Sequence, residues 1–322
     1  MTVPVSPAGD SSYPQSSGVS FDGSWERSGR SLNSSALLAL LGIGVLYFNG
    51  QSLLAIVAVF IGGISENVAD GGYFHTLLRH LRDLADPLRV AIVLSQYLLM
   101  LLPTVLLVRR WHSSDVRLYI RFTGSRVSEI ALALLATLMI IPSSNFIADE
   151  LVRQLGIPDE LMQVGAELFT ARSPVEFVWL VFVVCLTPAL CEEIFFRGFV
   201  QRTFERTMGW KSVVLVGGVF GLFHFNPLGL ISLSILGLLF GYFYYRSRSL
   251  IPPMVAHFGN NLVAVLVLYG GSQGTAGPTT TAIPLWLVGA TLPVGIVTLL
   301  WYAKVTVRRE RHREGMENLR YS

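Results

Sequence analysis

Long apolar stretches dominate the chain from residue 36 onward. About eight of them approach the roughly 20 residues that a helix needs to cross the hydrocarbon core of a bilayer. They cover residues 36–64, 88–108, 127–147, 174–204, 212–225, 228–245, 250–268 and 283–303. The pattern predicts an all-α fold, a polytopic transmembrane helical bundle of about eight spans. The first stretch contains the polar run Asn49-Gly50-Gln51-Ser52, so it fits either one span or a re-entrant pair of short segments.

Composition excludes a soluble protein and a nucleic-acid-binding protein. Hydrophobic residues make up 52% of the 322 residues and charged residues 14%, with a mean hydropathy of +0.55, whereas soluble domains carry about 25% charged residues. The formal net charge is only +3, and the basic excess lies from Lys304 onward rather than over the face of a folded domain. The two cysteines, Cys185 and Cys191, predict neither a disulfide framework nor a CxxC metal site.

The chain divides into five regions by composition. The first is a tail rich in Ser, Gly and Pro that we expect to be polar and disordered. It is followed by N-terminal transmembrane helices, a core that carries the polar residues discussed below, an outer loop with the last transmembrane helix, and a basic cytoplasmic tail. The bounds of these regions are 1–35, 36–173, 174–268, 269–304 and 305–322.

Basic residues recur at every second connection between the apolar stretches. They are Arg109, Arg110, Arg117, Arg121 and Arg126, then Arg206 and Lys211, then Arg246 and Arg248, then the basic tail. Cytoplasmic loops carry an excess of Lys and Arg, so we expect a multi-pass protein of the cell membrane with both termini in the cytoplasm. An even number of spans keeps this alternation.

A few ionisable and amide residues lie inside the apolar stretches, where they are costly and therefore candidates for function. They are Glu192, Glu193, Arg197, His224, His257 and Asn261. We expect them to converge about a third to halfway into the membrane, by the 1.5 Å rise of a helix. A chance set of these residue types on three helices is much less common than a single buried histidine or a single structural ion pair.

The spacing of these residues suggests different roles. Glu193 and Arg197 are four apart on one helix and can pair, which leaves Glu192 as the carboxylate that could act as a general base. His257 and Asn261 are also four apart, and together could donate hydrogen bonds to a developing oxyanion. His224, on another helix, could orient water beside Glu192.

The motifs EExxxR, FxxxH and HxxxN, which begin at Glu192, Phe220 and His257, resemble those of the CPBP family of intramembrane proteases. That family includes the type II CAAX prenyl endopeptidases and proteins linked to bacteriocin self-immunity. The resemblance implies a hydrolase, an intramembrane endopeptidase, in which Glu192 activates water with support from Glu193 and Arg197. It implies further that His224 positions the water and that His257 and Asn261 stabilise the oxyanion.

The resemblance leaves the cofactor open. A scheme without a metal is favoured, because Asn261 is a poor zinc ligand and suits an oxyanion hole. The alternative is Zn²⁺ held by Glu192, His224 and His257 in a His₂Glu site, although the helical HExxH motif is absent. The expected partners are the lipid bilayer and a membrane-bound peptide or protein substrate, prenylated or carrying a leader peptide, and no nucleic acid.

Two other function classes remain as alternatives. One is a transporter or proton relay that uses the buried Glu, Arg and His residues, and the other is a bacteriocin-immunity factor without catalysis. Residues 270–274 match the GxSxG nucleophile pattern, but no strand precedes them, so a flexible loop is expected. His75, His80 and His112 fall in connections and are expected to be solvated. Two GxxxG spacings, from Gly217 and from Gly237, fit closely packed helices and also fit the general abundance of small residues in membrane helices.

Overall fold

The computed structural model describes residues 18–62, 80, 83–156, 166, 168–273 and 283–320, and every regular element among them is a helix. Several long helices contain π-helical segments, labelled η. The elements in chain order are α1 (Ser24–Arg27), α2 (Leu32–Gly62), α4 (Ala85–Leu94), η1 (Ser95–Leu101), α5 (Leu102–Leu107), η2 (Val108–His112), α6 (Val116–Tyr119), α7 (Val127–Gln154), α9 (Pro174–Leu180), η3 (Val181–Leu186), α10 (Thr187–Glu193), η4 (Ile194–Gln201), α11 (Arg202–Met208), α12 (Lys211–Leu222), α13 (Leu230–Ser247), α14 (Ile251–Ser272) and α15 (Leu285–Arg320). The all-α fold is confirmed.

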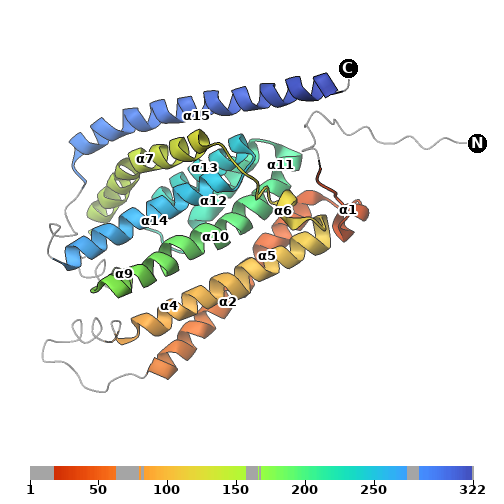
Figure 1. Cartoon of the computed structure of the whole chain (residues 1–322). Coiled ribbons are helices and arrows are strands. Elements are labelled where there is room, and N and C mark those ends of the chain that lie inside the picture. Colours follow the sequence, from red (N-terminus) through yellow and green to blue (C-terminus); the bar gives the residue numbers. More distant parts are fainter. Residues whose placement is uncertain are drawn as a thin grey trace, which may run out of the picture.

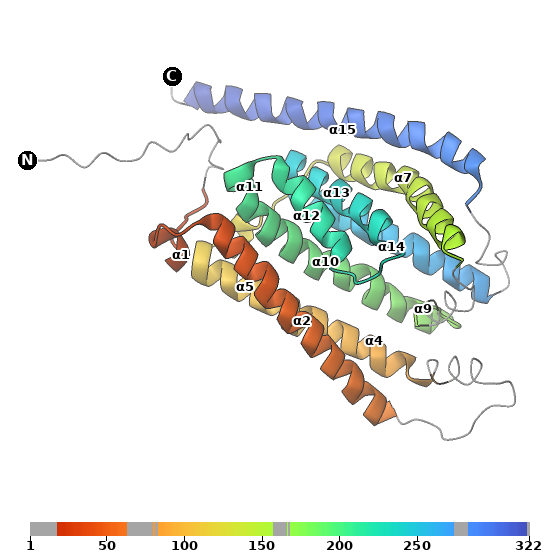
Figure 2. The same cartoon turned by 180° about the vertical axis from the view of Figure 1, so that it is seen from behind.

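The helices form a bundle whose central member is the long helix that runs from α9 to α11 (Figure 1). On one side of it lie α2 and the helix from α4 to η2, and on the other side α13 and α14 pack against α7. The last helix, α15, covers α7 at the outer edge, and Figure 2 shows α12 and α13 side by side. Many large apolar side chains on the outer helices are exposed, which is the surface that a bilayer requires.

Seven of the described helices are long and apolar enough to cross a membrane. The remaining predicted span, 212–225, the fifth along the chain, forms α12, which has 12 residues. At 1.5 Å per residue this is roughly 18 Å, shorter than the hydrocarbon core of about 30 Å. Phe225 has a positive φ of 47° and Pro227 follows, so the helix ends before that span is complete. Helix α13 runs back alongside α12, so the two helices form a hairpin. The chain that follows α13 is therefore at the same end of the bundle as the chain that precedes α12.

The first apolar stretch is a single helix, α2, which runs without a break through its polar run. Asn49 donates its side-chain amide to the carbonyl of Val45, and the hydroxyl of Ser52 donates to the carbonyl of Phe48, each at 2.8 Å. The polar side chains therefore find acceptors in the preceding turn of the helix itself. Of the two alternatives, one span describes these residues and a re-entrant pair does not.

The basic connections lie together at one end of the bundle. The carbonyl of Arg110 accepts from Ser24, the carboxylate of Glu205 binds both Arg121 and Arg248, and Arg246 donates to the carbonyl of Ala303. These contacts join α1, η2, the segment before α7, α11, the end of α13 and the last span. The basic connections that alternate along the sequence thus meet at one end of the bundle.

Part of the predicted disordered tail is ordered. Residues 1–17 lie outside the described residues, but 18–35 include α1 and the first turn of α2. Glu26 accepts hydrogen bonds from the ring of His112 at 2.7 Å and from Nη2 of Arg206 at 3.0 Å. The expectation that His112 is solvated was wrong, since its side chain is completely buried. Hydropathy alone could not predict that this segment is ordered. Ion pairs and the packing of Trp25 against Trp111 hold it in place, and neither depends on a long apolar run.

Two more boundaries differ from the predicted regions. The helix of the last span continues to Arg320, so the basic tail extends this helix. Gly270, Gly271 and Ser272 of the GxSxG match belong to the last turn of α14, while Gly274 lies outside the described residues. No strand precedes Ser272, whose hydroxyl donates to the carbonyl of Ala171. His80 is half-buried, and His75 lies outside the described residues.

The Glu26 contacts predict a loss of stability in acid. Burial raises the pKa of Glu26, but the hydrogen bonds from His112 and Arg206 outweigh it, so the net pKa lies below its ordinary value of 4.5. A carboxylate with a lowered folded-state pKa stabilises the protein above its ordinary pKa and loses this effect as the pH falls through the folded-state pKa. Glu26→Gln should therefore lower the free energy of unfolding at pH 7, and the difference from wild type should shrink below pH 4.5. Unfolding in detergent across a pH series checks this, and a difference that is constant down to pH 3 contradicts it.

Close packing at the two GxxxG spacings is confirmed. A Cβ atom on Gly217 would lie 2.8 Å from the backbone nitrogen of Leu238, and one on Gly237 would lie 2.5 Å from the carbonyl oxygen of Gly217. One on Gly221 would lie 2.2 Å from the hydroxyl oxygen of Ser234. Only glycine allows the backbones of α12 and α13 to approach this closely.

Adjacent glycines of α12 offer a matched test of this packing. Gly217→Ala should destabilise the protein by about 1–3 kcal/mol because the added methyl group forces the helices apart. Nothing lies within 4 Å of a Cβ atom on Gly218, so Gly218→Ala should be neutral or slightly stabilising, as expected from helix propensity. Thermal unfolding of both variants in detergent measures the difference, and equal effects would refute the close approach.

Candidate active site

The structure brings five of the six predicted residues into two contacting groups. Glu192 and Glu193 end α10, and Arg197 follows one turn later in η4. His224 follows α12, and His257 lies in α14. One group consists of Glu193, Arg197 and His257, and the other of Glu192 and His224. The predicted convergence of these five residues is therefore present in the fold.

Glu193 is the shared acceptor of the first group. Its Oε1 accepts from Nη1 of Arg197 and from Nδ1 of His257, each at 2.9 Å. Glu193 and Arg197 have no exposed surface, and His257 is 4% exposed. The pairing of Glu193 with Arg197 follows the predicted spacing, while the bond to His257 fixes which ring nitrogen of that histidine remains open: Nε2.

Arg197 joins three helices. Besides Glu193, it donates from Nη2 to the carbonyl of Gly237 in α13 at 3.1 Å. Its guanidinium lies 4.4 Å from the ring centre of Phe220 and 5.4 Å from that of Phe240. An arginine can make all of these contacts at once because its fork of donors is planar and its face stacks on aromatic rings. Phe220 also contacts the rings of His224 and His257, so it packs against both groups.

Glu192 is held on one side and open on the other. Its Oε1 accepts from the side-chain amide of Gln96 at 2.9 Å, and the same amide lies 3.2 Å from the hydroxyl of Tyr47. The other oxygen, Oε2, is buried and has no hydrogen-bond partner among the described residues. A buried acceptor without a partner costs free energy, and Oε2 of Glu193 is a second such acceptor.

His224 faces the free oxygen of Glu192. Its Nδ1 lies 2.8 Å from the carbonyl oxygen of Phe220, which is near the end of α12. A carbonyl can only accept, so Nδ1 carries a proton and Nε2 is the nitrogen directed elsewhere. That Nε2 lies 4.0 Å from Oε2 of Glu192. The separation is too long for a direct hydrogen bond, but a small polar group could bond to both atoms.

Asn261 does not join either group. Its Nδ2 donates to the carbonyl of Val184 at 2.7 Å, and its Oδ1 accepts from Asn260. In a regular α-helix the carbonyl of Val184 would accept from the nitrogen four residues later, but that residue is Pro188, which has no N–H. Asn261 therefore satisfies the carbonyl that Pro188 leaves free, and this bond ties α14 to the helix that carries the glutamates.

The glutamates occupy a short α-helical segment between two π-helical segments. Seven residues form α10, with η3 before it and η4 after it. π-Helical turns are rare and occur frequently at functional sites, because the wider turn redirects side chains. Pro188 lies in the first turn of α10, where the helix changes from π-helical to α-helical.

The residues named for zinc do not form a three-ligand site. Glu192 and His224 approach each other, but Nδ1 of His257 is bound to Glu193. Among the residues that the structure describes, no group of three or more His, Cys, Asp or Glu side chains could hold a metal ion. The reaction proposed for this site therefore uses the side chains of the protein.

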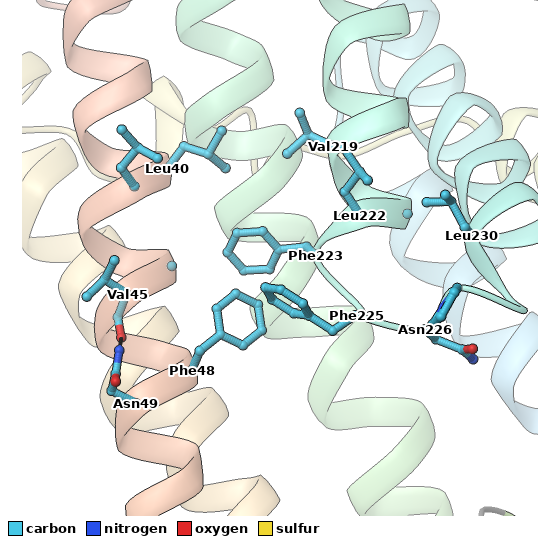
Figure 3. Close-up of a pocket in the computed structure, with 14 residues that line it drawn as sticks. Leu40, Val45, Phe48, Asn49, Val219, Leu222, Phe223, Phe225, Asn226 and Leu230 are labelled. Carbon is cyan, nitrogen blue, oxygen red and sulfur yellow. Dashed lines mark hydrogen bonds between the residues drawn. The ribbon is translucent and has the colours of Figure 1, made fainter.

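An apolar groove opens beside His224. It has a volume of about 790 Å³ and lies between α2 and the end of α12. Figure 3 shows the rings of Phe48, Phe223 and Phe225 together at its centre, with Asn49 and Asn226 as polar residues at its margin. Phe223 and Phe225 flank His224 in the chain, so the groove is adjacent to the Glu192 group but is not lined by it.

Sequence reasoning missed two residues of the site, Gln96 and Tyr47. The signal for Gln96 was present, because an amide inside an apolar span needs a partner as a charge does. Tyr47 carried no such signal, since tyrosine is common in membrane helices and only the packing of α2 against η1 brings it to Gln96.

The fold and the site define a polytopic helical membrane protein with buried carboxylates and imidazoles in its central helices. Residues 174–263 match the family model described as Type II CAAX prenyl endopeptidase Rce1-like, over more than a quarter of the chain. This match confirms the resemblance to the CPBP family of intramembrane proteases. Comparison with curated proteins gave no match, and comparison with solved structures gave none either.

The role of the hydrogen bond from Asn261 to the carbonyl of Val184 can be tested by replacing Pro188, which has no N–H to donate to that carbonyl. Asn261→Ala should lower the free energy of unfolding by about 1–2 kcal/mol, since it leaves a buried acceptor unsatisfied. In a Pro188→Ala background the restored N–H can serve that carbonyl, so the same substitution should cost less. A double-mutant cycle by unfolding in detergent measures the coupling. Asn49→Ala, which removes an amide that bonds only within α2, is the control and should show no coupling to Pro188.

Proposed function

We propose that this protein hydrolyses peptide bonds of membrane-associated substrates, with Glu192 as the general base. The match over residues 174–263 supports an intramembrane endopeptidase at the level of the family. The observation that carries the assignment of the base is the free, buried Oε2 of Glu192, which faces Nε2 of His224 at 4.0 Å. Oε2 of Glu193 also has no hydrogen-bond partner among the described residues. Glu193 is the less suitable base, because it is completely buried and already pairs with Arg197 and His257.

The attacking water would lie between Glu192 and His224. In the neutral tautomer with the proton on Nδ1, Nε2 of His224 is an acceptor. The water would donate one hydrogen bond to Oε2 of Glu192 and the other to this nitrogen, which leaves an oxygen lone pair free for the substrate carbonyl. As the C–O bond forms, Glu192 takes the first proton, and it gives this proton to the leaving amine when the C–N bond breaks. The bond from Gln96 to Oε1 keeps the carboxylate oriented so that Oε2 faces the water.

The oxyanion would be stabilised by His257 and Asn261. Glu193 accepts from Nδ1 of His257, and a proton on Nε2 would allow this nitrogen to donate to the oxyanion. The amide of Asn261 has two hydrogens, of which the bond to Val184 uses one. Arg197 acts through Glu193 and is a positioning residue.

The substrate would approach from the bilayer and from the basic face of the bundle. The apolar groove between α2 and α12 suits an apolar segment or a lipid chain attached to a peptide, as in a prenylated CAAX-type or leader-peptide substrate. The basic connections share one end of the bundle, which we assign to the cytoplasm together with both termini.

Substitution of the base tests the proposed reaction. Glu192→Gln should reduce kcat for cleavage of a prenylated CAAX peptide or a leader peptide by about 10²–10⁴-fold, because the amide cannot accept the proton. The thermal stability should change little, since Gln96 can still donate to the new side chain. Glu150→Gln, which alters an exposed ion pair with Arg153, is the control and should keep full activity. Full activity of Glu192→Gln would refute the assignment of the base.

The same assay addresses the metal. With the wild-type protein, incubation with a chelator followed by removal of the chelate should leave kcat unchanged. Loss of activity that Zn²⁺ restores would replace the scheme above with one based on a metal.

A further inference from the structure

A second buried charge cluster lies at the basic end of the bundle, away from the candidate active site. Its only carboxylate among the described residues is that of Glu205 in α11, which is 2% exposed. Arg121 donates to both oxygens of this carboxylate, at 2.9 and 2.7 Å, and Arg248 binds Oε1 as well. Arg202 lies beside them with Nη1 at 3.9 Å from the same oxygen.

Arg202 is the exceptional member of the cluster. Its side chain is more than nine-tenths buried, yet it makes no hydrogen bond to any residue that the structure describes, and its Nε has no partner. A contact of 3.9 Å to Glu205 is too long for a hydrogen bond. The remaining polar groups nearby are already used, since Tyr119 bonds to Thr203 and Tyr244 donates to the carbonyl of Ile120.

The cluster therefore has an excess of positive charge. It holds three guanidinium groups, those of Arg121, Arg202 and Arg248, against the single carboxylate of Glu205. Arg121 uses this carboxylate most fully: burial lowers the pKa of Arg121, but the attraction of Glu205 outweighs it and raises the net pKa. A buried arginine without a counterion costs several kcal/mol, so an additional anion at Arg202 would stabilise the fold.

We propose that Arg202, together with Arg121 and Arg248, binds the phosphate group of an anionic phospholipid headgroup. The cluster joins α11, the last segment of its long helix, to the residue that follows α13 and to the connection before α7. Since helix ends and basic connections meet there, we expect lipid headgroups at this level. Pockets of basic residues between the cytoplasmic ends of membrane helices are suited to such headgroups. Guanidinium groups match the oxygens of a phosphate in geometry and charge. Arg248 is 27% exposed and provides access from the surface.

The carboxylate at the end of a substrate is a less suitable occupant. Arg202 follows Glu192 by ten positions in one continuous helix, which corresponds to roughly 15 Å. An extended tripeptide spans only about 10 Å. The terminal carboxylate of a substrate cleaved three residues from its end would therefore stop short of Arg202.

Lipid binding by the purified full-length protein tests the proposal. Wild type, Arg202→Gln and Arg248→Gln are compared for the rise in Tm caused by phosphatidylglycerol relative to phosphatidylcholine, and for the affinity for each lipid. Arg202→Gln should weaken the preference for phosphatidylglycerol by at least about fivefold, the equivalent of the ~1 kcal/mol that one basic residue contributes at an anionic surface. In phosphatidylcholine alone its Tm should equal or exceed that of wild type, because an unpaired buried charge is gone.

The control is Arg117→Gln, which removes the same charge from an exposed position on the same face. It should keep the preference for phosphatidylglycerol, and an equal loss in both variants would overturn the proposal in favour of general surface attraction. Equal stabilisation by inorganic phosphate would show a site for free anions and would overturn the assignment to a lipid. If Arg202→Gln leaves the lipid preference intact but raises KM only for peptides with a free terminal carboxylate, the site belongs to the substrate. Arg248→Gln, at the exposed rim, should lose less of the preference for phosphatidylglycerol than Arg202→Gln. Because Arg248 is partly exposed, this variant still tests the site if the buried variant Arg202→Gln fails to fold.

Discussion

The carboxylate of Glu193 is the acceptor on which the central part of the structure depends. In a medium of low dielectric an unpaired guanidinium or imidazolium is prohibitively costly, and Glu193 accepts from both Arg197 and His257. Through Arg197 the same carboxylate reaches the carbonyl of Gly237. Three helices are thus joined by charge where packing of apolar side chains alone would give little specificity, because lipid is as apolar as the helices.

The helix that carries the glutamates is irregular, and each irregularity has a partner elsewhere in the bundle. Pro188 leaves one carbonyl free, and a side chain of α14 supplies the missing donor. The end of α12 leaves another free, and the ring of His224 takes it. Lipid chains cannot donate or accept hydrogen bonds, so such backbone groups need partners within the protein. The residues that complete the backbone are therefore also residues that the family resemblance assigns to the reaction, and structural and chemical roles fall on the same side chains.

Hydropathy predicted the bundle well because the bilayer imposes a fixed length on every span. It failed at α12, where a turn ends the helix early, and at residues 18–35, where ion pairs such as that of Glu26 hold a polar segment. Spacing predicted the pairing of Glu193 with Arg197, since four residues bring side chains together on any helix. It could not predict that Gln96 contacts Glu192 or that Asn261 contacts Val184. The members of the first pair are separated by 96 positions in the chain and those of the second by 77.

The short helix α12 separates two properties that are usually linked in membrane proteins. In a helix that crosses the whole membrane, adding or removing a turn changes the depth of its residues and also the point where the chain leaves the membrane. Here α12 and α13 turn back together, so the number of turns in α12 sets how deep His224 lies, while the helices that follow keep their direction. Insertions or deletions of one helical turn in this hairpin could therefore change the depth of the bond that is cleaved without inverting the rest of the protein.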